Sequence, residues 1–313
     1  MSSPVKILVV GAGAIGGFYG AILHRAGAEV SVVARSDLAV LRERGYRISS
    51  PLGDLSFQPS KVYASTEEVE ESPDYLIVSL KLIKSVDRIG IMRPAVGPNT
   101  AIVLIQNGID IEPEVVEAFP NNPLISCLAF VGVSRVAPGK LEHKAYGRLV
   151  FGNYPRGVSA EAERLSALLE AGGINTQLSE DVVRERWLKS VWNTAFNPSS
   201  VLAGGADTQT LLTTPGGEEL IRGFMEEVCA TAAAAGYPLP ADIIDKNISA
   251  TKKMPAYHNS MALDFLNGRE MEIEPMLGNV VRIARKHGVP VPRLETMYGL
   301  LQLLVANKAS NAQ

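Results

Sequence analysis

The chain has 313 residues, 46% of them hydrophobic and 20% charged, and a formal net charge of -3. This length is enough for two domains that each bury a core, and the composition is that of an ordinary globular protein. So small a net charge gives no reason to expect nucleic acid or an anionic membrane as a partner. The two cysteines, Cys127 and Cys229, lie far apart and match no metal-ligand spacing. We therefore expect neither a structural zinc site nor a disulfide framework, and a reducing compartment fits.

The apolar run at residues 7–10 resembles the start of a secretion signal, but it breaks into glycines and no cleavage-site pattern follows it. No stretch of about 18 uncharged apolar residues occurs, so we expect no membrane span. The chain is therefore expected to be cytoplasmic.

The first half of the chain alternates short β-branched runs with helix-compatible segments. The expected elements are a strand at 6–10, a helix at 14–26, and strands at 29–34, 74–80 and 101–105. Alternation with strands that are apolar throughout predicts a parallel, doubly wound sheet of the Rossmann type, covered by helices on both faces. Further strands at 124–133, 140–144 and 148–152 lie closer together around a Pro-Gly turn, which indicates an antiparallel edge.

From about residue 180 the strand signals stop and helices take over. They are expected at 181–197, 218–235, 241–253, 276–287 and 293–306, separated by proline and glycine. We place the domain boundary near Ser179, with an α/β domain at 1–179 and an all-helical domain at 180–313.

The pattern G-x-G-x-x-G stands directly after the first predicted strand and at the start of the first predicted helix. Its six positions are Gly11, Ala12, Gly13, Ala14, Ile15 and Gly16. Gly11 permits a tight turn, Gly13 lets the backbone approach a pyrophosphate, and Gly16 lets the helix pack close to the sheet. The helix N-terminus offers free N–H groups to the phosphates. In this context the pattern predicts dinucleotide binding.

The end of the second strand indicates which dinucleotide is bound. NAD-binding versions of this fold carry an acidic residue about 20 residues on, which accepts a hydrogen bond from the ribose 2′-OH. This chain has Arg35 there, and a guanidinium can hold a 2′-phosphate with two charge-assisted hydrogen bonds. The alternative is that Arg35 is a solvated loop residue and Asp37 takes the acidic role. We favour NADPH.

Two polar residues follow later strands of the predicted sheet, where ligands sit in open parallel sheets. Lys81 follows the strand at 74–80 and could contact the cofactor or the substrate. Asn107 follows the strand at 101–105 and could bond ribose or nicotinamide. The alternatives are a surface lysine and a plain Asn-Gly turn, and the residues alone do not decide between them.

Lys189, Asn193 and Asn197 follow one another at intervals of four, so they project from one side of a predicted helix. Asparagine is a mediocre helix former, and two of them in register with a lysine require an explanation. Trp192 and Phe196 border this stripe and make its surroundings partly apolar. The alternative is an ordinary polar face turned toward water.

The pattern K-x-x-x-N-x-x-x-N-P, together with the glycine-rich fingerprint, resembles the ketopantoate reductase (2-dehydropantoate 2-reductase) family, and the resemblance spans nearly the whole chain. Further matching motifs are Leu80-Lys81, Asn107-Gly108, the block from Ser260-Met261 through Asp264, Arg269 and Glu272-Ile273, and the ending at 285–292. The family's threonine before the glutamate is Met271 here. The resemblance implies NADPH-dependent reduction of ketopantoate to (R)-pantoate in pantothenate biosynthesis.

The resemblance also implies a catalytic pair. Lys189 would be the general acid that protonates the developing alkoxide, and Glu272 would hold the geometry of proton transfer. A fixed ammonium stabilises the negative charge that grows on the carbonyl oxygen, and a nearby carboxylate favours the ammonium form. We expect this ammonium, from the C-terminal half, to meet a ketone placed over the nicotinamide held by the N-terminal half. The reaction requires no metal.

The substrate-binding residues are likewise implied by the resemblance. Asn193 and Asn197 would hydrogen-bond the substrate, and Ser260 would bind its carboxylate. Asn107 would lie where cofactor and substrate meet, and Lys81 would line the same cleft.

Two departures from the family pattern affect the substrate end. A further substrate-contacting asparagine of some members is Asp207 here or is absent, and residues 257–259 are not the small residues expected before Ser260. They keep open a second hypothesis, a reductase of another 2-keto acid that yields a D-2-hydroxy acid. A third hypothesis is an NADP-binding regulatory protein without turnover, against which the intact lysine, asparagine and glutamate set argues. His143 is expected to be an exposed strand residue. A homodimer is compatible with the sequence, although no heptad pattern requires one.

Overall fold

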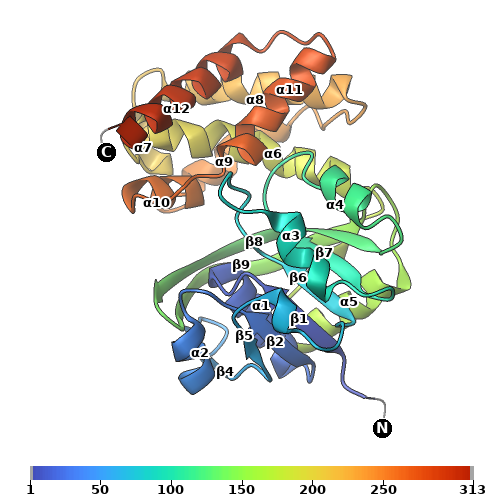
Figure 1. Ribbon diagram of the computed structural model, residues 1–313. Helices are drawn as coiled ribbons and strands as arrows, with labels where there is room; N and C mark the ends of the chain where they lie inside the picture. Colours follow the sequence, from blue (N-terminus) through green and yellow to red (C-terminus); the bar gives the residue numbers. More distant parts are fainter. Residues whose placement is uncertain (1–2, 311–313) are drawn as a thin grey trace. The chain divides into compact units, whose positions relative to one another are not determined.

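The computed structural model describes residues 3–310, and the chain forms two compact units. One comprises Met1–Asn107 and Glu112–Val183, and the other Gly108–Ile111 and Arg184–Gln313. The first is an α/β unit and the second is helical (Figure 1). In the described part of the chain, no helix combines the length and the apolar character that crossing a bilayer demands.

The α/β unit is built on a ten-stranded sheet in the order β4-β3-β9-β8-β7-β6-β1-β2-β5, with β10 beside β9. All neighbouring pairs are parallel except β3–β4 and β8–β9. The strands are β1 (Lys6–Val10), β2 (Glu29–Val33), β3 (Tyr46–Ser49), β4 (Leu55–Phe57), β5 (Val62–Tyr63), β6 (Tyr75–Val78), β7 (Ala101–Ile105), β8 (Leu124–Ala137), β9 (Lys140–Asn153) and β10 (Thr176–Leu178). The expected parallel core is confirmed.

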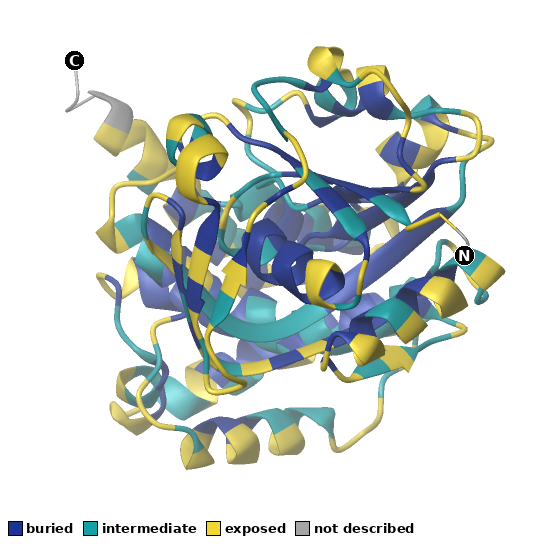
Figure 2. Cartoon of the chain, turned by 90° about the horizontal axis from the view of Figure 1, so that it is seen from below, coloured by how far each residue is buried: buried dark blue, intermediate teal, exposed yellow. Residues whose placement is uncertain are grey.

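Helices cover both faces of this sheet. They are α1 (Ala14–Arg25), α2 (Leu38–Arg44), α3 (Arg88–Met92), α4 (Pro113–Ala118) and α5 (Ala160–Ala171), with 3₁₀ turns η1 (Thr66–Glu68) and η2 (Arg93–Ala95). Ile7 and Val9 of β1 pack into a core that includes α1 and α5, while Leu8 and Val10 pack into a second core with α3 and α4. Because successive strand residues point to opposite faces, β1 must be apolar throughout. The central strands are accordingly buried along their length (Figure 2).

The β8–β9 hairpin differs from the expectation. Two 14-residue strands replace the three expected, because β9 continues through the segment between them with register shifts against β8. Tyr146 and Gly147 have positive φ there, at 65° and 124°, which absorbs the irregularity. The pair is antiparallel as expected, but β9 is not an edge, since β3 and β10 pair with it.

Up to residue 310, the regular elements of the second unit are all helical, as expected. They are α6 (Val182–Leu202), α7 (Thr208–Thr213), α8 (Gly217–Ala234), α9 (Ile243–Lys253), α10 (Ser260–Leu266), α11 (Asn279–Lys286) and α12 (Pro292–Ser310), with a π-helical turn η3 (Glu274–Gly278). The expectation that α6 ends before Pro198 is wrong. Ser199 Oγ donates to the carbonyl of Ala195 at 2.6 Å and Asn259 Nδ2 to that of Phe196 at 3.3 Å, so side chains bond carbonyls beside the proline.

The turn from β1 into α1 yields a stability prediction. A Cβ at Gly16 would lie 2.2 Å from the carbonyl oxygen of Gly11, whereas one at Gly13 would meet nothing within 4 Å. Overpacking costs about 1–3 kcal/mol, which outweighs the roughly 1 kcal/mol that alanine gains over glycine inside a helix. Gly16→Ala should therefore lower the free energy of unfolding measured in urea.

Gly13→Ala is the matched control, and it should cost less stability than Gly16→Ala. Equal unfolding midpoints for the two variants would contradict the close approach seen at Gly16.

Candidate active site

The fingerprint residues form the turn between β1 and α1 (residues 11–13) and the first residues of α1. Gly11 has φ +109°, and its carbonyl oxygen accepts a hydrogen bond from Ser79 Oγ at 2.8 Å. Gly13 is exposed, is the N-cap residue of the helix and faces open space, while Ala12, Ala14 and Ile15 are partly buried. The first turn of α1 contains no acidic side chain. An accessible helix N-terminus with a glycine as its N-cap and no repelling charge in its first turn fits a pyrophosphate.

The residues after β2 lie at the same edge of the sheet, because Val10 of β1 is in register with Val33 of β2. Arg35 is exposed, whereas Asp37 is only 2% exposed. One carboxylate oxygen of Asp37 accepts from Ser36 Oγ at 2.9 Å, and the other accepts from the backbone N–H of Gly139 at 3.1 Å. Asp37 is therefore engaged within the protein, whereas Arg35 is an accessible positive charge at this strand end.

Lys81 and Asn107 follow the neighbouring parallel strands β6 and β7, and both are partly buried. Gln106 joins the two segments, since its Nε2 donates to the carbonyl of Leu80 at 2.6 Å. The buried Arg88 in turn donates to Gln106 Oε1 at 3.0 Å. These bonds fix the backbone directly before both candidate residues. Sequence reasoning missed Arg88 and Gln106, although Gln106 was visible as a polar residue ending an apolar strand.

In the helical unit, Lys189 lies on α6 close to two charged groups of opposite sign. Burial and, to a smaller extent, the guanidinium of Arg186 lower the pKa of Lys189 and the carboxylate of Glu272 raises it, and together they leave it at about 7. The carboxylate of Glu272 acts on Lys189 in the expected direction, but its effect on the pKa is smaller than the sum of the other two. Arg186 precedes Lys189 by three residues and was not identified from the sequence. It is 3% exposed, and its Nη1 donates to the carbonyl of Gly108 at 2.9 Å.

The contact between α6 and η3 explains how Glu272 comes close to Lys189. Thr194 Oγ1 on α6 donates to the carbonyl of Met276 in η3 at 2.8 Å. Glu272 lies two residues before η3 begins. The two charged residues, 83 positions apart in the chain, are therefore brought together by a packed helix pair.

The two asparagines of α6 differ in their surroundings. Asn193 is partly buried, whereas Asn197 is 2% exposed and its Oδ1 is buried with no hydrogen-bond partner. Trp192 and Phe196 stack beside them with ring centroids 4.7 Å apart. An orphaned buried acceptor is costly unless a ligand satisfies it. Asn197 therefore does not belong to a polar face turned toward water.

Ser260 is exposed and begins α10. The preceding Asn259 caps this helix, accepting from Ala262 N at 2.9 Å, and its Nδ2 donates to Ser200 Oγ on α6 at 2.7 Å. Asp207 similarly caps α7, accepting from Gln209 N at 2.8 Å. The two departures from the family pattern thus have structural roles as helix caps.

His143 does not have the expected exposure. It is 3% exposed, its Nδ1 lies 2.9 Å from Ser50 Oγ, and its ring packs on Phe18 with centroids 4.4 Å apart. The strand carrying it is covered on this face by α1, which a local alternation pattern could not indicate.

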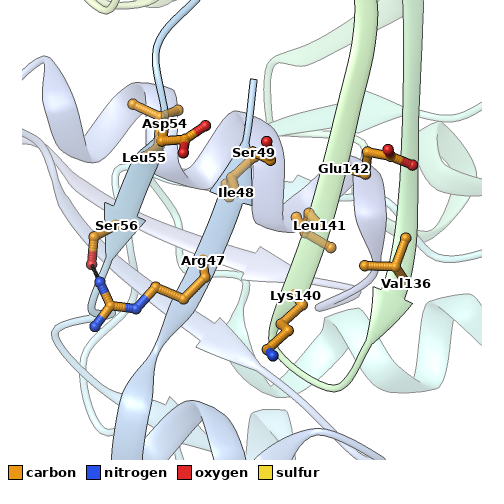
Figure 3. A pocket seen from close by; sticks show the side chains of 10 residues that line it. All are labelled: Arg47, Ile48, Ser49, Asp54, Leu55, Ser56, Val136, Lys140, Leu141 and Glu142. Carbon is orange, nitrogen blue, oxygen red and sulfur yellow. Dashed lines mark hydrogen bonds between the residues drawn. The ribbon is translucent and has the colours of Figure 1, made fainter. Parts of the chain in front are cut away.

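A shallow pocket lies on β3, β4 and the β8–β9 hairpin (Figure 3). Its floor and rim include Ile48, Leu55 and Leu141, and Arg47 crosses to Ser56 Oγ at 2.9 Å. The lining includes none of the candidate site residues. Within residues 3–310, no cluster of histidine, cysteine and acidic side chains is arranged to hold a metal ion.

Comparison with known proteins gives the same family for both units. The family described as Ketopantoate reductase PanE/ApbA matches residues 7–156, and its C-terminal counterpart matches residues 181–305. The chain is 30% identical over 304 residues to a 2-dehydropantoate 2-reductase of Nostoc sp., covering 96% of this chain and 95% of that one.

Solved structures agree. The chain is 51% identical to the 2-dehydropantoate 2-reductase from Methylococcus capsulatus, with a TM-score of 0.92 over 97% of each chain. A D-mandelate dehydrogenase solved with NADH and anilino(oxo)acetate is 21% identical, with a TM-score of 0.87 over 96% of this chain and 98% of that one, a likeness of fold. The chain therefore belongs to the ketopantoate reductase family and is an NAD(P)-dependent oxidoreductase.

Proposed function

We propose that this protein reduces ketopantoate to (R)-pantoate with NADPH, as a step of pantothenate biosynthesis. Residues 1–179 would bind the cofactor and residues 180–313 would supply substrate binding and proton transfer. The observation that carries the proposal is the charge cluster of the helical unit. Lys189, with Glu272 and Arg186 close by, has a pKa of about 7, where a general acid is most effective in a neutral cell.

The cofactor would lie against the loop from Gly11 to Gly16, with its 2′-phosphate on Arg35. Two observations support NADPH over NADH. Arg35 is exposed at the strand end, and both carboxylate oxygens of Asp37 already accept hydrogen bonds within the protein. Asn107 and Lys81, on adjacent strand ends, would complete this side of the site.

When bound, the reduced nicotinamide supplies a hydride to the keto carbon of the substrate. Lys189 stabilises the negative charge that develops on the carbonyl oxygen and then donates its proton to that oxygen. Glu272 favours the protonated amine before transfer. Asn197, with its unpartnered buried Oδ1, accepts a hydrogen bond from a substrate hydroxyl, and Asn193 orients the substrate beside it. Ser260 bonds the substrate carboxylate.

The alternative substrate is another 2-keto acid reduced to a D-2-hydroxy acid. The likeness to D-mandelate dehydrogenase favours it, because that protein has this fold with another acid bound. The caps formed by Asn259 and Asp207 weigh against it, since these departures serve the helices. A regulatory protein without turnover would have no need of a proton donor near neutral pKa.

The substrate is tested by following NADPH oxidation with purified protein and a panel of 2-keto acids that includes ketopantoate, pyruvate and benzoylformate. We expect kcat/KM for ketopantoate to exceed that for the others by at least about 100-fold, because a site that hydrogen-bonds a substrate hydroxyl rejects analogues without one. Preference for another acid would favour the alternative substrate, and no oxidation with any acid would favour the regulatory protein.

Lys189→Ala should lower kcat by about 10²–10⁴-fold, the range for loss of a general acid. Lys246→Ala is the matched control, because Lys246 is an exposed lysine of the same unit that pairs with Asp242. Circular dichroism of both variants checks their folding. A Lys189→Ala enzyme with near-normal kcat would remove the proposed proton donor.

The pH profile gives an independent measure of the same group. Lys189 acts as an acid only while protonated, so kcat/KM for reduction should be constant below its pKa and fall about tenfold per pH unit above it. The midpoint is expected near pH 7. Arg186→Met removes a repelling charge and should move the midpoint to higher pH, whereas Glu272→Gln should move it to lower pH. Shifts in the opposite directions would refute this charge arrangement.

A further inference from the structure

The tip of the β8–β9 hairpin reaches the residues that follow β2. Arg135, near the end of β8, donates through Nη1 to Ser36 Oγ at 3.0 Å and forms an ion pair with Asp37 at 2.5 Å. Arg135 thus contacts both residues that follow the exposed Arg35, although it lies 99 positions from Ser36 in the sequence. The Arg135 guanidinium is therefore held at the strand end that Arg35 follows, against the hydroxyl of Ser36 and the carboxylate of Asp37.

Backbone bonds on both sides fix this hairpin tip. The N–H of Gly139 donates to Asp37 at 3.1 Å, and the carbonyl of Gly139 accepts from Arg47 N at 2.8 Å. Gly139 has φ +67°, and a Cβ there would lie 2.9 Å from the carbonyl oxygen of Gly45. Arg135 is consequently carried to Asp37 by a braced hairpin rather than by a free loop.

The ion pair between Asp37 and Arg135 matters because of where the carboxylate lies. Asp37 is two residues from Arg35 and 2% exposed, whereas the Arg135 side chain is 39% exposed and covers it. An uncompensated carboxylate at this place would repel a phosphate and would instead accept a hydrogen bond from a ribose 2′-OH. Removing Arg135 would leave the carboxylate of Asp37 as such an uncompensated buried charge.

We propose that Arg135 masks the carboxylate of Asp37 and is thereby a determinant of the preference for a 2′-phosphorylated over an unphosphorylated dinucleotide. This role rests on the proposed binding of the 2′-phosphate at Arg35. It assigns the two arginines different functions, because Arg35 attracts the phosphate and Arg135 removes a repulsion.

The test compares kcat/KM for NADPH and for NADH in the wild-type protein and in Arg135→Met. Loss of the mask should lower the NADPH/NADH ratio by about 10- to 100-fold, the size expected for two charges several ångströms apart near a protein surface, and NADH should gain in absolute kcat/KM. In Arg35→Ala, by comparison, kcat/KM for NADPH should fall, and kcat/KM for NADH should not rise. Arg148→Met, an exposed arginine of the same hairpin bonded to Gln177, is the control and should leave the ratio unchanged.

The double variant Arg135→Met/Asp37→Asn separates masking from direct contact with the phosphate. If Arg135 masks Asp37, neutralising Asp37 restores the NADPH preference, whereas a direct phosphate ligand would leave the double variant as poor as Arg135→Met. Should Arg135→Met fail to fold, Asp37→Asn alone is informative, because masking predicts a ratio equal to or above that of the wild type.

The outcomes distinguish this inference from the proposed function. A wild-type preference for NADPH with an unchanged ratio in Arg135→Met overturns masking and leaves NADPH standing. A wild-type preference for NADH overturns both.

Discussion

In the proposed reaction, the protonation of one lysine decides whether the helical unit can supply a proton. Burial alone would favour the neutral amine of Lys189, which could not serve as an acid. Arg186 acts in the same direction, and Glu272 opposes both. The result is a pKa near 7, where the ammonium exists at neutral pH yet gives up its proton readily. This balance needs all three groups, and α6 supplies two of them on one face by their spacing of three residues.

In the proposed function, the α/β unit has a different role. It must offer hydrogen-bond donors to the phosphates of the cofactor without filling the cofactor site with side chains. Parallel strands end at one edge, so the glycines after β1, the arginine after β2, and the lysine and asparagine after β6 and β7 lie along it. The buried bond from Arg88 to Gln106 and on to Leu80 holds two of these strand ends together. Rigid backbone there places polar groups at low entropic cost on binding.

Much of the fold could be predicted because its signals are local. Strands β1 and β7 and the start of α1 follow from apolar runs and the glycine pattern at the expected residues. The short elements α2, β3, β4 and α7 carry too few residues for a period to show, and they exist because tertiary contacts complete them. Pro198 misled the prediction for α6, because the side chains of Ser199 and Asn259 bond backbone carbonyls of this helix near the proline and let it continue where an isolated helix would end.

The candidate site likewise has features that local sequence patterns predict and features that depend on contacts between distant residues. The stripe of Lys189, Asn193 and Asn197 is visible because helical spacing is local, whereas the ion pair of Asp37 joins residues 98 positions apart. From the sequence alone, Asp37 could therefore have bound the ribose 2′-OH in place of a 2′-phosphate bound by Arg35. The contact that removes this rival depends on a hairpin whose length and bulges cannot be deduced from alternation. Charge at a binding site is thus a property of the folded neighbourhood, and the residue type at one position specifies only part of it.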